Sequence, residues 1–165
     1  MIFVTVGNAL QGFPRLLEAV EREAKQGILS GEDILFQCGH TNGFFPETGR
    51  LVSFLPLEEF EGNIQQAELV IAHAGAGTLI HVFRAGKVPL VMPRQKRYGE
   101  HVDDHQLEFV EALAAQGRVL PVLDSDGLGS VIECARIRTK KTDPLIVESG
   151  LHLISDAIKE VIHCP

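Results

Sequence analysis

Residues 69–78 read Leu69-Val70-Ile71-Ala72-His73-Ala74-Gly75-Ala76-Gly77-Thr78, an apolar run that leads into a glycine-rich turn. The apolar run predicts a buried β-strand, and the pattern from Thr78 onward predicts a helix that ends before Gly86. Glycines allow a backbone to approach an anion closely, and the free N–H groups in the first turn of a helix point at that anion. This strand, turn and helix have the layout of a phosphate-binding loop, with His73 and Thr78 as side-chain donors at its rim.

Short apolar runs alternate with helical patterns along the rest of the chain. Several of these runs are apolar throughout, which is typical of strands in a sheet covered on both faces. The alternation predicts an α/β fold, a Rossmann-like parallel sheet with helices on both faces and right-handed crossovers. We expect strands at Ile2–Val6, Asp33–Cys38, Arg50–Phe54, Leu69–His73, Val88–Met92 and Val119–Leu123, and helices at Phe13–Gln26, Leu57–Gln66, Thr78–Ala85 and His101–Gln116.

The C-terminal part of the chain gives weaker patterns. Val131–Ile137 is compatible with a helix, and a last helix is expected at about Leu145–Ile162. No internal repeat, low-complexity segment or linker divides the sequence. The 165 residues are therefore expected to form a single domain, residues 1–165, with the helix at about 145–162 as a candidate partner contact.

Composition and charge exclude several classes of protein. Hydrophobic residues make up 45% of the chain and charged residues 22%, and no apolar run approaches the length of a membrane span. The start, residues 1–6, lacks the features of a signal peptide and favours a first strand, so we expect a cytoplasmic chain. The formal charge of −7 argues against nucleic acid as a partner. The basic run Arg94-Gln95-Lys96-Arg97 is interpreted as a solvated face.

The cysteines give no sign of a structural site. Cys38, Cys134 and Cys164 lie far apart, and none belongs to a CxxC pair. We therefore expect neither a disulfide framework nor a zinc site.

Loops that carry polar or glycine residues follow four of the expected strands. They are Gly7-Asn8-Ala9, Phe54-Leu55-Pro56, the glycine turn and the segment from Pro93 to Gln106. Each has a plainer explanation, since Gly7 needs only to make a turn and a histidine at a strand end is commonly structural. Open parallel sheets bind ligands at the carboxyl ends of their strands, so the convergence of these loops favours a binding site.

Common nucleotide-binding motifs do not fit the chain. The turn after the first strand, Gly7-Asn8-Ala9-Leu10-Gln11-Gly12, has neither the GxGxxG spacing of a dinucleotide site nor the Lys-Ser/Thr of a P-loop. The glycine turn is more distinctive when it is taken with Gly86-Lys87-Val88-Pro89 and with Gly99-Glu100-His101-Val102-Asp103-Asp104-His105-Gln106.

At these motifs, and at Phe3-Val4-Thr5-Val6-Gly7, the sequence resembles the C-terminal, nucleotide-sugar-binding half of GT-B glycosyltransferases of family 28. The resemblance covers nearly the whole chain. It is closest to the short single-domain members, the catalytic subunits of two-part glycosyltransferases that use UDP-N-acetylglucosamine or build exopolysaccharides.

The resemblance implies a UDP-sugar site at the motif-bearing loops. His73 and the backbone of Gly75, Ala76, Gly77 and Thr78 would hold the diphosphate. Phe54 and Leu55 would flank the uracil through main-chain groups, while Gly7 and Asn8 would form the loop under the reacting centre. His73 and Asn8 are the residues expected to act in catalysis.

The same resemblance implies that Asp104, His105 and Gln106 hydrogen-bond hydroxyls of the donor sugar. Two positions depart from the usual pattern. The family commonly has a Glu that bonds both ribose hydroxyls where this chain has His81, and His81 alone can make only one such bond. A Thr commonly follows the first glycine, where this chain has Asn8.

The implied activity is hexosyl transfer from a UDP-sugar to a lipid-linked acceptor in polysaccharide or glycolipid synthesis. Donors aimed at the diphosphate act where negative charge develops, so the reaction is expected to need neither a metal nor another cofactor. The general base has no clear candidate here and is expected from a membrane-anchored, acceptor-binding partner subunit. Such a heteromer would place the chain at the cytosolic, inner face of a membrane, peripherally.

Two other interpretations stay open. His101 and His105, at i and i+4 of an expected helix with two carboxylates between them, resemble the ligands of a metal hydrolase, although the HExxH glutamate is missing. A non-catalytic regulatory subunit that binds a nucleotide sugar is the other, because His81 replaces the usual Glu.

Overall fold

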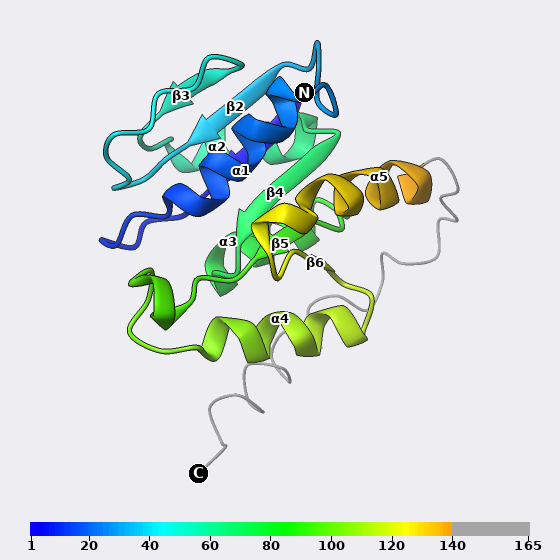
Figure 1. The fold of residues 1–165 in the computed structure, drawn as a ribbon. Helices are drawn as coiled ribbons and strands as arrows, with labels where there is room; N and C mark the ends of the chain where they lie inside the picture. The colour runs from blue at the N-terminus through cyan, green and yellow to red at the C-terminus, as the bar shows by residue number, and fades with distance from the viewer. Residues whose placement is uncertain (140–165) are drawn as a thin grey trace.

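The structure, a computed structural model, describes residues 1–139, and these form one six-stranded sheet covered by helices (Figure 1). The strand order is β3-β2-β1-β4-β5-β6. Every neighbouring pair is parallel. The expected Rossmann-like α/β fold is confirmed. Its elements are β1 (Ile2–Thr5), α1 (Pro14–Lys25), β2 (Ile34–Gln37), β3 (Arg50–Val52), α2 (Leu57–Gln66), β4 (Leu69–His73), α3 (Ala76–Arg84), β5 (Leu90–Met92), the 3₁₀ turn η1 (Lys96–Tyr98), α4 (His105–Ala115), β6 (Leu120–Pro121), the 3₁₀ turn η2 (Ser125–Gly127) and α5 (Leu128–Thr139).

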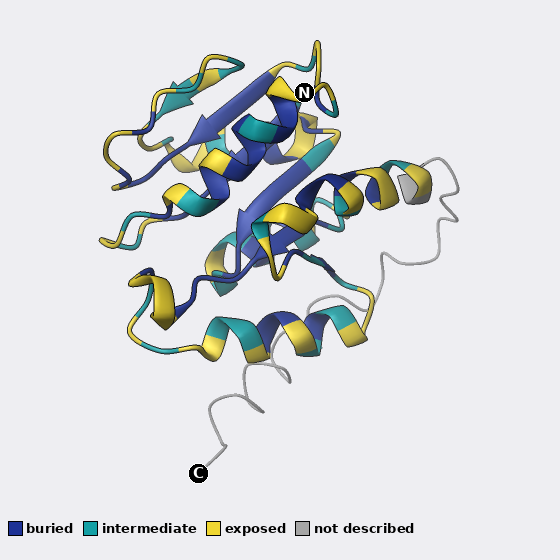
Figure 2. Cartoon of the chain, in the orientation of Figure 1, coloured by how far each residue is buried: buried dark blue, intermediate teal, exposed yellow. Residues whose placement is uncertain are grey.

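Both faces of the sheet are covered, because successive side chains of a strand point to opposite faces. In β1, Ile2 and Val4 pack with residues of α1 and α5, whereas Phe3 packs with residues of α2 and α3. Val91 of β5 belongs to a third hydrophobic cluster, where it packs with residues of α3 and α4. Figure 2 shows the consequence: the central strands are buried except at the start of β4, where Leu69 is partly exposed, and most helices are buried along one side only.

The sheet has a switch point between β1 and β4. The chain builds β2 and β3 on one side of β1 and then crosses to place β4 on the other side. Connections on the two sides of this point leave in opposite directions, which opens a crevice at the carboxyl ends of the two strands. The glycine turn after β4 and the Gly7-Asn8 loop after β1 both lie at this crevice.

Several elements differ at their ends from the sequence prediction. β5 begins at Leu90, because Pro89 has no N–H to donate to a neighbouring strand. β6 is short and lies at the edge of the sheet, where Pro121 also lacks an N–H. α5 is longer than expected and begins at Leu128. The strand Leu69–His73 and the helix Leu57–Gln66 are found with the expected bounds.

The largest error concerns α4, which begins at His105 and not at His101. The Asp103 carboxylate accepts a hydrogen bond of 3.2 Å from the His105 N–H, and Asp104 has non-helical backbone angles. Side chains that bond the backbone locally in this way favour helix starts over helix interiors. His101 therefore precedes the helix, and its expected i, i+4 relation to His105 on one helix face is wrong.

Other expectations concern the thiols, the tail and the membrane. Cys38 is buried and Cys134 exposed, and both are free thiols. The expected helix Leu145–Ile162 lies outside the described residues. Within residues 1–139, the helices are too short or too polar to cross a bilayer.

Candidate functional site

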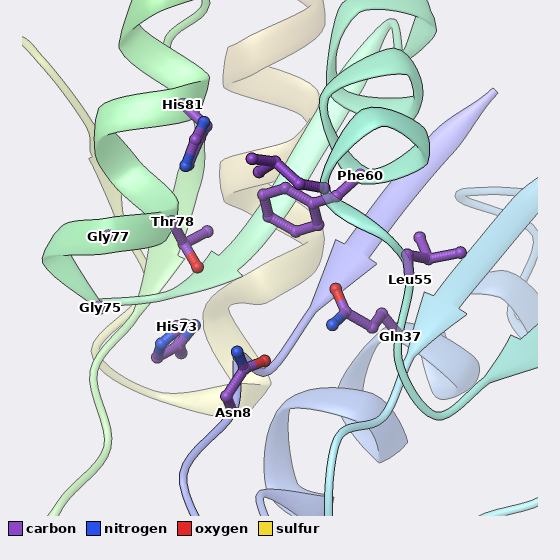
Figure 3. Close-up of a pocket in the computed structure, with 11 residues that line it drawn as sticks. Asn8, Gln37, Leu55, Phe60, His73, Gly75, Gly77, Thr78 and His81 are labelled. Carbon is purple, nitrogen blue, oxygen red and sulfur yellow. The ribbon is translucent and has the colours of Figure 1, made fainter.

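A cavity of about 420 Å³ lies at the switch point. Its walls come from both sides of the crevice and from helix α2 (Figure 3). Eight of the residues expected from the sequence line it: Gly7, Asn8, Leu55, His73, Gly75, Gly77, Thr78 and His81. Three that the sequence analysis did not single out also line it: Gln37, Leu57 and Phe60.

The N-terminus of α3 forms one wall of this cavity. Gly75 is the N-cap, and the first intrahelical bond runs from the Leu79 N–H to the Gly75 carbonyl at 3.0 Å. The N–H groups of the first turn therefore have no acceptor within the helix. No acidic side chain occupies that turn, and the Thr78 hydroxyl points into the cavity (Figure 3). This wall is suited to an anion, since unpaired N–H groups and the helix dipole both favour negative charge.

His73 forms the floor beside that wall, with 7% of its surface exposed. Its ring is enclosed by glycines, because a Cβ on either Gly7 or Gly75 would collide with the imidazole. Gly7 also has a φ of +71°, which disfavours any side chain there. The Nδ1 atom is buried and makes no hydrogen bond within residues 1–139.

The His73 imidazole is neutral at physiological pH. Burial lowers the pKa of His73 to about 3, and the positive charges of Arg94 and, to a smaller extent, His101 act in the same direction. The backbone of Thr5 has an opposite, weaker effect on that pKa. A neutral imidazole still provides one N–H donor, and an anion bound beside it would favour protonation.

A hydrogen-bond chain fixes the loop after β1. The Gly7 N–H donates to the Thr5 hydroxyl at 3.3 Å, and that hydroxyl donates to Gln37 Oε1 at 2.9 Å. Gln37 is buried, and its amide group faces the cavity (Figure 3). Asn8 lies beside His73, between it and Gln37 (Figure 3). A polar residue that ends an otherwise apolar strand was the available signal for Gln37.

Leu55 and Phe60 form the wall opposite the glycine turn. Leu55 follows β3, and Phe60 lies on α2 with its ring edge-on to Phe3 at 5.5 Å. Phe54 does not line the cavity; its ring packs edge-on against His40 at 5.0 Å. The proposed contact of Phe54 with uracil involves main-chain groups, so it stays a prediction.

His81 lies one helical turn beyond Gly77, at the α2 side of the cavity. Its Nδ1 atom is 2.8 Å from Glu61 Oε1 on α2. Its ring stands edge-on to Phe60, with the ring centres 5.8 Å apart. A carboxylate of the neighbouring helix α2 thus lies beside position 81. Glu61 carried no local signal, because its partner is 20 residues away in the chain.

The segment after β5 is built around Arg94, which is 1% exposed. Its guanidinium donates to the carbonyl oxygens of Val6, Gln11, Gly12 and Glu100, at 2.8 to 3.2 Å. The interpretation of Arg94 as part of a solvated face is wrong, although Lys96 and Arg97 are exposed. Burial lowers the pKa of Arg94 to about 10, while Glu100 opposes the shift, so the side chain stays charged at neutral pH. These bonds tie the loop after β1 to the loop after β5.

The three residues expected at the donor sugar lie in this segment, outside the cavity lining. Asp104 accepts a bond from the Lys96 N–H at 2.8 Å, and Gln106 Oε1 accepts one from the Arg94 N–H at 3.0 Å. His105 pairs with Asp103 at 3.0 Å. These side chains order the loop, and their contact with a sugar stays a prediction. Ala76 contributes backbone at the first turn of α3, while its side chain packs into the core.

His101 and His105 both bind the same carboxylate. His101 Nδ1 is 2.9 Å from Asp103 Oδ1, and His105 Nδ1 is 3.0 Å from Asp103 Oδ2. Burial is the largest single effect on the pKa of Asp103 and raises it, but the His105 backbone N–H and the two histidine side chains together lower that pKa below its ordinary value. No group of three or more His, Cys, Asp or Glu side chains within residues 1–139 is arranged to hold a metal ion.

The chain is similar in sequence to a family of known proteins. Residues 1–146 match the family described as the glycosyltransferase family 28 C-terminal domain. The chain belongs to glycosyltransferase family 28. The UDP-N-acetylglucosamine transferase subunit ALG13 of Yarrowia lipolytica is 32% identical over 144 residues, which cover 79% of this chain and 69% of that protein.

Two larger enzymes are also similar to this family 28 chain. The UDP-N-acetylglucosamine–N-acetylmuramyl-(pentapeptide) pyrophosphoryl-undecaprenol N-acetylglucosamine transferase of Geobacter sulfurreducens is 29% identical over 163 residues, covering 97% of this chain and 40% of that enzyme. The crystal structure of the kitacinnamycin glycosyltransferase superposes with a TM-score of 0.60 at 16% identity, covering 97% of this chain and 38% of that one. The family 28 chain thus has the fold of one half of a GT-B glycosyltransferase and spans less than half of these two proteins.

Proposed function

We propose that this chain is the donor-binding, catalytic subunit of a UDP-sugar-dependent hexosyltransferase. The acceptor is lipid-linked, as in polysaccharide or glycolipid synthesis. A membrane-anchored partner subunit binds that acceptor and holds the chain at the cytosolic face of the membrane.

One observation carries this proposal: the unpaired N–H groups of α3 and the buried His73 converge on one cavity at the switch point. A wall of this kind is suited to bind an anion of the size of a diphosphate. Leu55, at the opposite wall, is placed to flank a planar base. The names of the Yarrowia and Geobacter relatives, both transferases of UDP-N-acetylglucosamine, support a uridine diphosphate donor.

The chemistry follows from charge development at the leaving group. Sugar transfer places growing negative charge on the departing diphosphate, and fixed donors at that position stabilise the transition state. Hydrogen bonds to a charged group contribute about 1.5–3 kcal/mol each, and a helix N-terminus about 0.3–2 kcal/mol. Together they replace a metal ion, with His73 and the first turn of α3 as the main contributors and Asn8 beside the reacting centre.

The acceptor's general base is assigned to the partner subunit. Among the titratable side chains that line the cavity, His73 is buried at the diphosphate end and His81 is engaged by Glu61. The name of the Yarrowia relative describes a subunit, and that of the Geobacter relative contains a lipid-linked pyrophosphate acceptor. Both support a two-part enzyme for a lipid acceptor.

Co-expression tests the proposal. The chain should move to the membrane fraction when it is produced with a membrane-anchored, acceptor-binding glycosyltransferase half, and the pair should transfer sugar to a lipid-linked acceptor. The chain alone should bind UDP-sugar without appreciable transfer. Robust transfer by the chain alone would contradict the two-part assignment, while binding without transfer by any pair would favour the regulatory alternative.

A further inference from the structure

Gln37 brings an oriented hydrogen-bonding group to the cavity. Its side chain is buried, with 3% of the residue exposed, and its amide group faces the cavity (Figure 3). Oε1 accepts a bond of 2.9 Å from the Thr5 hydroxyl, whereas Nε2 makes no hydrogen bond within residues 1–139. Buried polar groups are almost always paired, so this nitrogen calls for an acceptor inside the cavity.

The Thr5 hydroxyl fixes which end of the Gln37 amide is free. This hydroxyl accepts the Gly7 N–H at 3.3 Å and has one proton of its own to donate. That proton goes to Gln37, so the atom that receives it is the amide oxygen. The free end of the amide is therefore the NH₂ group, which can only donate hydrogen bonds.

Strand pairing places Gln37 at the end of the cavity away from the glycine turn. Gln37 ends β2 and lies beside Thr5 of β1 on one side and Val52 of β3 on the other. β4, which leads into the glycine turn, lies on the far side of β1. Neighbouring strands are about 4.8 Å apart, so Gln37 lies roughly 10 Å from the strand that carries His73. Leu55, which follows β3, lines the same end of the cavity (Figure 3).

A nucleotide would meet the two ends of the cavity with different groups. One ribose separates the 5′-phosphates from the base, so a diphosphate at the first turn of α3 directs the base toward Gln37 and Leu55. Uracil carries two carbonyl oxygens, which are acceptors, and one N–H, which is a donor. An amide nitrogen that can only donate matches a carbonyl oxygen of this base.

We propose that Gln37 donates a hydrogen bond from Nε2 to a carbonyl oxygen of uracil in the donor nucleotide, with Thr5 as the positioning residue that holds the amide in this orientation. The inference rests on the proposed uridine diphosphate site. It adds a side-chain contact to a base whose expected contacts with Phe54 and Leu55 use main-chain groups. Sites that hydrogen-bond a polar group of a ligand discriminate against analogues that lack it.

The test compares UDP with 2-thio-UDP and 4-thio-UDP by calorimetry on the full chain. Sulfur preserves the ring but accepts hydrogen bonds weakly, so the analogue altered at the carbonyl that Gln37 contacts should bind the wild-type chain about fivefold more weakly than UDP. In Gln37→Met, UDP itself should bind about fivefold more weakly, and the preference for UDP over that analogue should vanish. Gln65→Met, which changes an exposed glutamine of α2, should leave every affinity unchanged.

Thr5→Val is the second variant. It keeps Gln37 in place and removes the hydroxyl that orients the amide. The preference for UDP over the same analogue should shrink without vanishing, because the amide can then turn its oxygen into the cavity. A purely structural role of Gln37 would instead weaken UDP and both analogues by the same factor.

The outcomes separate the inference from the proposed function. Loss of the preference in Gln37→Met, with the fold retained in thermal unfolding, supports the inference. Equal weakening of UDP and both analogues, or unchanged affinities, overturns it and leaves the uridine diphosphate site intact. If Gln37→Met does not fold, a reduced preference in Thr5→Val supports the inference and a full preference overturns it. Absence of UDP binding by the wild-type chain overturns both the inference and the proposed function.

Discussion

The His73 imidazole lies against Gly75 so closely that a Cβ on Gly75 would collide with Nε2. The residue that begins the anion-binding turn and the side chain that forms the floor of the cavity are thus one packed unit. Gly7 completes the unit from the other side of the ring. The glycine-rich sequence is explained by the packing of His73 as much as by access for an anion.

The first prediction concerns this packing. Gly75→Ala should lower the free energy of unfolding by about 1–3 kcal/mol, because the new methyl group displaces His73 from a close-packed position. Gly62→Ala is the matched control, since Gly62 lies inside α2 with open space at its Cβ position. That change should raise the stability by about 0.5–1 kcal/mol through helix propensity. Urea unfolding measures both, and an undiminished stability of Gly75→Ala would show that the ring is not confined.

The second prediction concerns Arg94. Arg94→Met should destabilise the chain by about 2–4 kcal/mol, because buried carbonyl groups of Val6 and of the loop after β1 lose their donor. Arg97→Met, on the exposed turn nearby, removes a charge whose recorded contact within residues 1–139 is the Tyr98 ring, and it should cost at most about 1 kcal/mol. Similar losses from the two changes, measured by urea unfolding, would refute a special role for Arg94.

The third prediction concerns the loss of folding stability at low pH. The pKa of His73 is about 3 in the folded chain and about 6.5 when unfolded, so only the unfolded chain takes up this proton between those values. Stability is therefore lost as the pH falls from 6.5, by about 1.4 kcal/mol per unit. Between pH 6.5 and pH 5, the wild-type chain should lose about 2 kcal/mol more than His73→Gln. Equal losses in urea unfolding would mean that His73 is protonated in the folded chain.

The fourth prediction concerns metal ions. Transfer by the complete two-part enzyme should continue in EDTA, because the first turn of α3 and His73 already stabilise the departing diphosphate. The assay is initial-rate transfer with and without chelator. Loss of activity in EDTA that manganese or zinc restores would favour a metal site at His101 and His105 over this account.

Much of the fold followed from local patterns. The strand Leu69–His73, the glycine turn and the parallel sheet could be predicted because their signals lie within a few consecutive residues. The start of α4 could not, since it depends on the Asp103 side chain, which takes the His105 N–H. Arg94 was misread for a related reason. Its charge resembles that of its exposed neighbours, whereas its acceptors in the loop after β1 lie more than 80 residues away.

The residues of the candidate site could likewise be predicted only where their signals are local in the sequence. Gly7, Asn8 and the glycine turn were predicted together because parallel strands bring their carboxyl ends to one edge. Gln37 was missed, since its place in the site depends on a hydrogen bond with Thr5, which is 32 residues away in the chain. Asp104 and Gln106 were assigned to the sugar, and in the structure they bond the backbone of their own loop.

The most direct test of the donor site is calorimetry of UDP and of uridine on the wild-type chain and on His73→Ala, with thermal unfolding as a check of the fold. The account predicts that UDP binds the wild-type chain and that His73→Ala weakens it by about 1.5–3 kcal/mol, the contribution of a hydrogen bond to a charged group. Uridine, which lacks the diphosphate, should bind both chains equally. An unchanged UDP affinity in a folded His73→Ala variant would contradict the diphosphate site at His73.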